Sequence, residues 1–166
     1  MLQGIIVKQL ETFADERGFF TELFRTDNKE IFSDEIVQTN MSVTYPNIIR
    51  AWHKHERGQV DYFIVIKGAS KICAYDDDTK ELNEIISTGE KIQVVRVPGH
   101  YWHGFKAIGN EPTHLVYFVN KLYDQSNPDE IRRSWDDPDI IPSMINDKSN
   151  DPRCGKPWDW KASPNK

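Results

Sequence analysis

The stretch "IIRAWHKHERGQVDYFIVIK" (residues 48–67) decides the fold, because it holds two consecutive β-type runs. The second run, "VDYFIVIK", is rich in β-branched and aromatic residues, which favour strands. The first run alternates, and strict alternation predicts one face with Arg50, Trp52 and Lys54 and the other with Ala51, His53 and His55. Both histidines are therefore expected on the same face of one strand.

Short apolar and aromatic runs of the same kind fill most of the chain. Turns containing glycine or proline separate them, and helix signals are few. This pattern predicts an all-β chain of antiparallel strands arranged as a double-sheet sandwich or barrel. Residues 1–122 are expected to form the barrel.

The composition shifts to proline, aspartate and asparagine after residue 122. Residues 123–166 are expected to form an irregular arm packed on the barrel, so that the chain is a single domain. One helical turn is expected at "PDEIRRSW", where Pro128 would occupy a first-turn position. The final residues are expected to be a disordered tail. The anchors expected for the arm are Trp135, Trp158 and Trp160.

Charge and cysteine content exclude several classes of protein. The formal net charge of -5 argues against nucleic-acid binding through a general basic surface, although a few arginines in one pocket remain compatible with an anionic small molecule. Two cysteines are too few for a disulfide framework, and Cys73 is expected to be a buried core residue. Neither a signal-peptide pattern nor a membrane-length apolar stretch is present, so a cytoplasmic protein without a membrane partner is expected.

Polar residues occur on strands that ought to face the barrel interior. Gln38 and Asn40 alternate in "VQTN", the two histidines follow on the next run, and His103 comes after a Pro-Gly turn in "PGHYWHGF". Because a barrel interior normally takes apolar side chains, such a cluster indicates a ligand cavity. The alternative is that His53 and His55 form hydrogen bonds on an exposed sheet face.

The same residues also resemble the ligand order of two-motif metal cupins. That order is His-x-His, an acidic residue and a glycine, followed later by a histidine after a Pro-Gly turn. Three imidazoles and a carboxylate suit iron, manganese, nickel or zinc. The gap from His55 to Asp61 is longer than in the usual motif, so a metal-dependent isomerase or dioxygenase is the alternative function. Its ligands would be His53, His55, Asp61 and His103.

Several further segments, in order, resemble the nucleotide-diphospho-4-keto-sugar 3,5-epimerases, typified by dTDP-4-dehydrorhamnose 3,5-epimerase. They are "DERGFFTELF", "VQTNMS", "IIRAWH", "WHGF", "LVYFVNKLY" and "WDDP". The resemblance covers roughly residues 1 to 142. It implies a cupin-type jelly-roll β-barrel that needs no metal or other cofactor. It also implies a homodimer in which a residue matching Arg17 contributes to the site of the other subunit.

The resemblance also implies roles for individual residues. His53 matches the general base and Tyr117 the general acid, although the tyrosine would otherwise be read as a core residue. Tyr123 matches a ring that stacks on the nucleotide base, and Glu130 lies near a further contact. Contacts to the sugar, its diphosphate or its 4-keto group are implied for Arg17, Glu22, Gln38, Asn40, Arg50 and His103.

The chemistry of such a reaction fits these residue types. A ketone at C4 acidifies the hydrogens on C3 and C5, so a base can remove one and leave an enolate, and inversion needs an acid on the opposite face. Histidine suits the base, and tyrosine, with a pKa near ~10, suits the acid. Arg50 and His103 are candidates to stabilise the enolate oxygen. The expected substrate is a nucleotide-diphosphate 4-keto-6-deoxy sugar, or a related 4-keto heptose, inverted at C3, C5 or both.

The sequence departs from the family pattern in two places. Asp61 stands where the family has a lysine near the enolate, and an anion there opposes enolate formation unless it is protonated, points elsewhere or binds another group. The family also supplies an aspartate that orients the base histidine from an S-x-K-D segment. This chain has no clear match, and Asp147 or Asp151 are the candidates.

Overall fold

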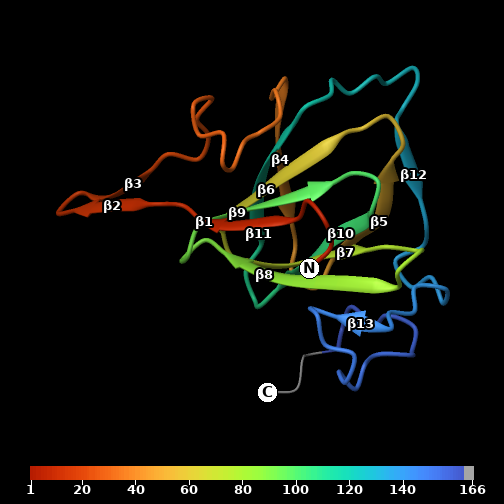
Figure 1. Cartoon of the computed structure of the whole chain (residues 1–166). Helices are drawn as coiled ribbons and strands as arrows, with labels where there is room; N and C mark the ends of the chain where they lie inside the picture. Colours follow the sequence, from red (N-terminus) through yellow and green to blue (C-terminus); the bar gives the residue numbers. More distant parts are fainter. Residues whose placement is uncertain (163–166) are drawn as a thin grey trace.

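The computed structural model describes residues 1–162, and within this range it contains strands and turns but no helix. The expected tail at residues 163–166 lies outside the described residues. The strands, labelled in Figure 1, are β1 (Ile6–Gln9), β2 (Thr12–Asp15), β3 (Gly18–Thr21), β4 (Gln38–Thr44), β5 (Ile49–His55), β6 (Val60–Lys67), β7 (Ala69–Tyr75), β8 (Glu81–Thr88), β9 (Gln93–Pro98), β10 (Trp102–Ile108), β11 (Thr113–Val119), β12 (Glu130–Arg132) and β13 (Met144–Ile145).

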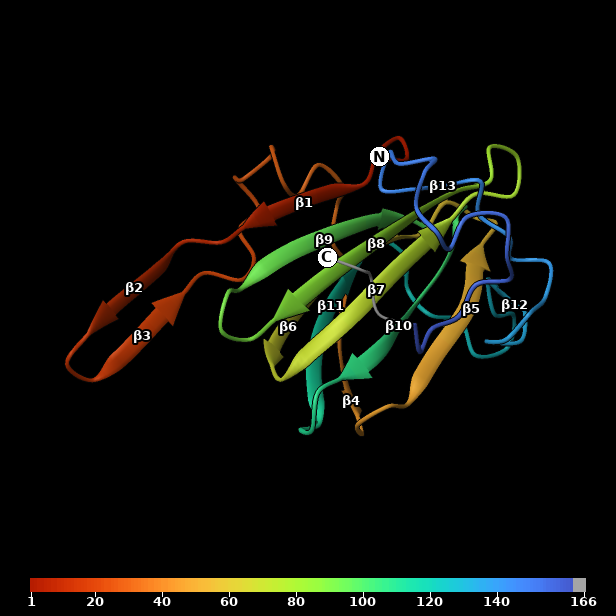
Figure 2. The ribbon, with the colours of Figure 1, turned by 90° about the horizontal axis from the view of Figure 1, so that it is seen from below.

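Two sheets face each other and form the barrel (Figures 1 and 2). One has the strand order β1-β9-β6-β11-β4 and the other β12-β5-β10-β7-β8-β13. All pairs within them are antiparallel except the short parallel pair of β13 with β8. This architecture confirms the expected all-β, double-sheet fold.

The sequence of β6 explains why this central strand of the five-stranded sheet is buried on both faces. Phe63 and Val65 point into the core between the sheets, together with Ile72 of the facing sheet. Tyr62 and Ile64 point to the other side, where a second cluster covers them. A strand buried on both faces needs a continuous apolar run rather than strict alternation. Each fully buried aliphatic or Phe side chain stabilises the fold by about 1.5–3 kcal/mol.

The segment after residue 122 adds edge strands to the six-stranded sheet. The helical turn expected at "PDEIRRSW" is wrong, because Glu130–Arg132 forms β12 and pairs with β5. The unpaired backbone groups of the β5 edge supply hydrogen-bond partners, and this tertiary pairing outweighs the local signal of the proline. Trp158 and Trp160 are buried against Trp52, as expected for anchors, but Trp135 is 39% exposed and is not one.

A β-bulge changes the expected faces of β5. His53 pairs with His103 and Arg50 pairs with Phe105, so β5 has one residue more than β10 between these two pairs. Strict alternation is therefore wrong here. Arg50 reaches toward the facing sheet, where its Nε donates to Thr44 Oγ1, so it lies on the same side as His53, whereas Ala51 packs on the outer cluster with Trp52. Gly104 permits the bulge, because a Cβ at this position would lie 2.3 Å from the Cβ of Ala51.

The β2–β3 hairpin extends away from the barrel (Figures 1 and 2). Its aromatic side chains Phe13, Phe19 and Phe20 are half or more exposed. Among the described residues, no helix is long and apolar enough to cross a membrane. Cys73 is buried and free, as expected.

Candidate active site

A cavity of about 880 Å³ opens between the two sheets and receives most of the predicted site residues. β4, β6 and β11 line it from one sheet, and β5 and β12 line it from the other. A volume of this size suits a ligand larger than a single sugar ring. The predicted residues that line it are Gln38, Asn40, Arg50, His53, Tyr117, Tyr123 and Glu130.

His53 lies on the cavity wall with a second histidine directly behind it. The ring centroids of His53 and His103 are 4.2 Å apart, and the two residues are paired across β5 and β10. Burial, followed by the neighbouring His103 and His55 rings, lowers the pKa of His53 well below its ordinary value of 6.5. His53 is therefore neutral at neutral pH, which is the state that a general base requires.

His103 is fully buried and fixed at both ring nitrogens. Its Nδ1 lies 2.8 Å from the carbonyl oxygen of Tyr101, so Nδ1 carries a proton. Its Nε2 lies 3.1 Å from Asp61 Oδ2, and this contact is a hydrogen bond only when one more proton lies between the two groups. His103 is not among the residues that line the cavity, and its ring lies behind that of His53, so the direct substrate contact that the resemblance implies for it stays a prediction.

Asp61 reaches across from the facing sheet and is 2% exposed. Besides His103, it accepts a hydrogen bond of 3.0 Å from Gln59 Nε2. The acid that replaces the family lysine is thus engaged by two partners. An unpaired carboxylate facing the substrate would oppose enolate formation. The geometry instead supports a carboxyl group of Asp61 that is paired with neighbouring protein groups.

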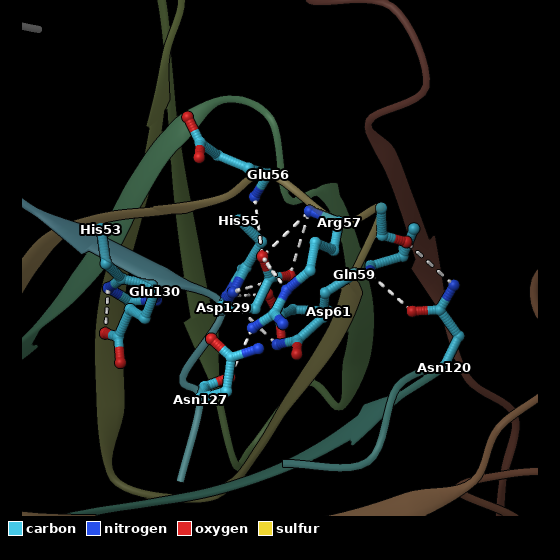
Figure 3. A network of polar contacts seen from close by, with 12 residues as sticks. His53, His55, Glu56, Arg57, Gln59, Asp61, Asn120, Asn127, Asp129 and Glu130 are labelled. Carbon is cyan, nitrogen blue, oxygen red and sulfur yellow. Dashed lines mark hydrogen bonds and ion pairs between the residues drawn. The ribbon is translucent and has the colours of Figure 1, made fainter. Parts of the chain in front are cut away.

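His55 is the third histidine of the cluster, and Figure 3 shows it close to Asp129. Gln59 Nε2 lies 3.1 Å from His55 Nε2, so this ring nitrogen accepts the amide proton and Nδ1 carries the ring proton. Asp129 Oδ2 is 4.0 Å from that Nδ1, and both oxygens of this carboxylate accept from the backbone N–H of Arg57. Burial lowers the pKa of His55, against the opposing effect of Asp61.

Tyr117 faces the cavity from β11, in the sheet opposite to β5. It pairs with Asn40 on one side and with Phe63 on the other. Burial raises the pKa of Tyr117 above its ordinary value of 10.0, and Asp61 and Glu130 raise it further, whereas Arg50 opposes them. The phenol therefore keeps its proton over the physiological pH range.

Three other predicted contacts lie at the cavity wall. Gln38 donates a hydrogen bond of 2.8 Å to Asn40 Oδ1 and accepts one of 2.9 Å from the backbone of Tyr123. Arg50 Nε donates a hydrogen bond of 3.0 Å to Thr44 Oγ1 on the facing sheet. These bonds fix the amides and the guanidinium before any ligand binds.

Two predicted contacts are not in the cavity of this chain. Arg17 pairs with Asp15 in the exposed hairpin turn, and Glu22 pairs with Arg25 after the hairpin. The candidate partners for the base also lie elsewhere. Asp147 binds the N-terminal amino group and Asp151 binds Arg153, whereas the carboxylate paired with His53 among the described residues belongs to Glu130.

Other lining residues were missed by the sequence interpretation. Gln59 and Asp129 had no local signal, since their partners are brought together by the barrel. Asp129 contacts a residue 72 positions away in sequence. The cavity is also lined by basic side chains that the family motifs did not indicate, namely Arg57, Lys121, Arg132 and Arg133.

The histidine cluster has the geometry to hold a metal ion. One ring nitrogen from each of His53, His55 and His103 can be chosen so that all three lie within 4.8 Å of one another. The Asp61 carboxylate contacts two of these rings. Such a donor set of imidazoles and a carboxylate suits first-row transition metals.

Fold and site together define a class of protein: a cupin-type β-barrel enzyme with a histidine and a tyrosine on opposite walls of a cavity larger than a single sugar ring. The family model for the polysaccharide biosynthesis C-terminal domain matches residues 13–131. The chain is 40% identical over 140 residues to the probable low-salt glycan biosynthesis epimerase of Haloferax volcanii, covering 81% of this chain and 89% of that one. It is 31% identical over 150 residues to the dTDP-4-dehydrorhamnose 3,5-epimerase of Methanothermobacter thermautotrophicus, covering 84% and 78%.

The fold of this chain is similar to that of solved epimerase structures. One is a dTDP-6-deoxy-D-glucose-3,5-epimerase from Legionella pneumophila in complex with dTDP-4-keto-L-rhamnose, with a TM-score of 0.72 at 23% identity, covering 82% of this chain and 76% of that one. The chain belongs to the polysaccharide biosynthesis C-terminal domain family and to the carbohydrate epimerases related to dTDP-4-dehydrorhamnose 3,5-epimerase. The expected family, fold and enzyme class are thereby confirmed.

Proposed function

We propose that this protein epimerises a nucleotide-diphosphate 4-keto-6-deoxy sugar at C3, C5 or both. The observation that carries the proposal is that His53 and Tyr117 face one cavity from opposite sheets. A sugar ring bound between the sheets would present one face to the base and the other to the acid. This is the arrangement that inversion at carbon requires.

The proton movements follow from the states of the two groups. Neutral His53 takes the proton from the carbon next to the ketone, and the electron pair of that C–H bond forms the enolate. Tyr117 then gives its phenolic proton to the same carbon from the opposite face. His53 ends protonated and Tyr117 ends as a phenolate, and exchange with water restores both. Arg50, on the cavity side, is positioned to stabilise the enolate oxygen.

The mouth of the cavity suits a nucleoside diphosphate. Its basic lining residues Arg57, Lys121 and Arg132 supply charge for a diphosphate. Tyr123, 59% exposed at the same mouth, offers a ring on which a nucleotide base can stack. The solved relatives from Legionella pneumophila and Streptomyces bikiniensis hold dTDP sugars, which supports this class of substrate.

We further propose that the protein is a homodimer. The cavity does not receive Arg17 from its own chain, and the hairpin that carries this residue extends away with exposed phenylalanines. A second copy would cover those rings and bring an arginine to the neighbouring cavity. Light scattering is expected to give twice the chain mass, and a stable, active monomer would contradict the dimer. A cytoplasmic location stays a prediction.

The test of the function is deuterium uptake from heavy water into dTDP-4-keto-6-deoxyglucose, followed by NMR. Incorporation at C3 or C5 is the expected result, and it identifies the carbon that the enzyme handles. No incorporation with any 4-keto-6-deoxy nucleotide sugar would contradict the proposal.

A metal-dependent reaction is the second candidate, because the nitrogens of three histidines converge. A divalent metal bound there would act as a Lewis acid toward a substrate oxygen. Elemental analysis of the purified protein distinguishes the two. Exchange that survives complete removal of metal supports His53 as the base, whereas exchange that requires stoichiometric metal supports coordination.

A further inference from the structure

Glu130 holds the one carboxylate that forms an ion pair with the proposed base among the described residues. Its Oε1 lies 3.9 Å from His53 Nδ1, and a dashed line in Figure 3 marks this contact. Both side chains are largely buried, with 19% of His53 and 21% of Glu130 exposed. The contact is therefore sheltered from bulk water, which strengthens it relative to a surface pair.

Strand pairing fixes where this carboxylate lies. Within β12, Glu130 pairs with His55 and Arg132 pairs with His53, so the backbone of β12 is hydrogen-bonded to the strand that carries the base. Arg132 also donates a hydrogen bond of 2.9 Å to Glu130 Oε2, which restricts the rotamer of the glutamate. The position of the carboxylate thus depends on the fold and not only on a flexible side chain.

The other carboxylates near the cluster are already engaged. Asp61 holds His103 and Gln59, and Asp129 holds the backbone and side chain of Arg57. Glu130 is also engaged, by Arg132, but among the described residues it is the carboxylate that lies within 4 Å of a ring nitrogen of His53. A glutamate from β12 therefore occupies the place for which Asp147 and Asp151 were the sequence candidates.

We infer that Glu130 is the positioning residue of His53, a role that rests on the proposed epimerase function. The carboxylate favours the tautomer with the proton on Nδ1, which leaves Nε2 unprotonated to accept the substrate proton. After abstraction, the same carboxylate stabilises the imidazolium. The 3.9 Å separation is longer than a hydrogen bond, so the role requires the two groups to move closer when substrate binds, as catalytic hydrogen bonds often do.

This role differs from the substrate contact that the family resemblance implies for Glu130. A residue that only binds substrate changes KM and leaves kcat nearly constant. A residue that orients the base changes kcat and leaves KM nearly constant, because its effect appears when His53 takes the proton. Kinetics of the variants therefore separate the two roles.

The kinetic test compares Glu130→Gln and Glu130→Asp with the control Glu56→Gln. Glu56 lies in the neighbouring turn, and its carboxylate points away from the cluster (Figure 3). In the deuterium-exchange assay, Glu130→Gln is expected to lower kcat by at least about 10-fold with KM within about twofold. Glu130→Asp keeps a carboxylate and is expected to retain more activity than the glutamine variant, and Glu56→Gln is expected to match wild type.

A second readout needs no substrate. Long-range ¹⁵N NMR of labelled histidines is expected to show His53 with its proton on Nδ1 in the wild type, and a shift toward Nε2 in Glu130→Leu. If the wild type exchanges no deuterium, the epimerase function fails while the tautomer still decides the role of Glu130. A wild-type His53 protonated on Nε2, or a Glu130→Gln variant with unchanged kcat in an active enzyme, overturns the inference.

Discussion

His53 and His103 lie edge to face across two paired strands, with ring centroids 4.2 Å apart. The buried ring of His103 is fixed by the Tyr101 carbonyl and by Asp61, and the ring of His53 packs against it. The ring of His53 faces the cavity. The base is thereby held by a buried neighbour that the ligand does not reach, which keeps its orientation constant between turnovers.

The rate is expected to be independent of pH over a wide range. Burial lowers the pKa of His53 below 6.5 and raises the pKa of Tyr117 above 10.0. The base loses activity only as pH falls through its lowered pKa, and the acid only as pH rises through its raised pKa. A plot of kcat/KM against pH should therefore be flat between 6.5 and 10. A bell with both limbs inside this interval would contradict the assignment.

Asp61→Ala is expected to destabilise the fold by about 1–3 kcal/mol, because it removes a buried hydrogen-bonded carboxyl group. The contacts with Gln59 and His103, of 3.0 and 3.1 Å, are both lost, which leaves their buried polar atoms without this partner. Urea unfolding of the variant measures the change in the free energy of unfolding. Asp78→Ala, on an exposed turn, is the matched control. Equal stability of the two variants would show that the pair contributes nothing.

Gly104→Ala is expected to destabilise the barrel by about 1–3 kcal/mol through overpacking. The new Cβ would lie 2.3 Å from Ala51 Cβ and 2.5 Å from the Arg50 carbonyl oxygen. β5 has to shift to relieve this, and the shift moves His53 with it. Thermal unfolding and deuterium exchange should therefore both decline. A variant with wild-type stability would mean that the bulge adapts freely.

Asp34 links a loop to the outer face of the five-stranded sheet. It accepts hydrogen bonds from Tyr62 at 2.5 Å and from Arg96 at 2.9 Å. Burial opposes its ionisation, but Tyr62 and Arg96 outweigh burial and the pKa of Asp34 lies below 3.8. A lowered pKa in the folded state means that this stabilisation is present above pH 3.8 and is lost as pH falls through the lowered pKa.

Asp34→Asn is therefore expected to cost about 1–3 kcal/mol of unfolding free energy at pH 7. The difference from wild type should shrink as the pH falls below 3.8. Urea unfolding at pH 7 and at pH 3 measures this difference in unfolding free energy, with Asp78→Asn on the exposed turn as the control. A difference that stays constant between the two pH values would contradict the role of the ionised carboxylate.

Much of the fold and the site follows from local sequence patterns. The β-type runs predict the strands, and the polar residues of β4 and β5 predict a cavity. The faces of Arg50 and Ala51 could not be predicted, because a bulge depends on the pairing of β5 with β10. The same holds for β12, where a proline next to acidic residues is compatible with either a helix start or an edge strand. Residues such as Asp129 lie far in sequence from their partners, so no local pattern indicates them.

The central claim is that His53 and Tyr117 are the acid–base pair of an epimerase. The most direct measurement is deuterium uptake at C3 and C5 of dTDP-4-keto-6-deoxyglucose by wild type, His53→Ala and Tyr117→Phe, each checked for folding by circular dichroism. The wild type is expected to take up deuterium and to invert the carbon, and the same spectra report both. His53→Ala is expected to lose at least about 100-fold in deuterium uptake, and Tyr117→Phe at least about 100-fold in the rate of inversion, because His53 alone can return a deuteron to the face that it deprotonates. A folded His53→Ala variant that takes up deuterium at the wild-type rate, or a folded Tyr117→Phe variant that inverts the carbon at the wild-type rate, would contradict the account.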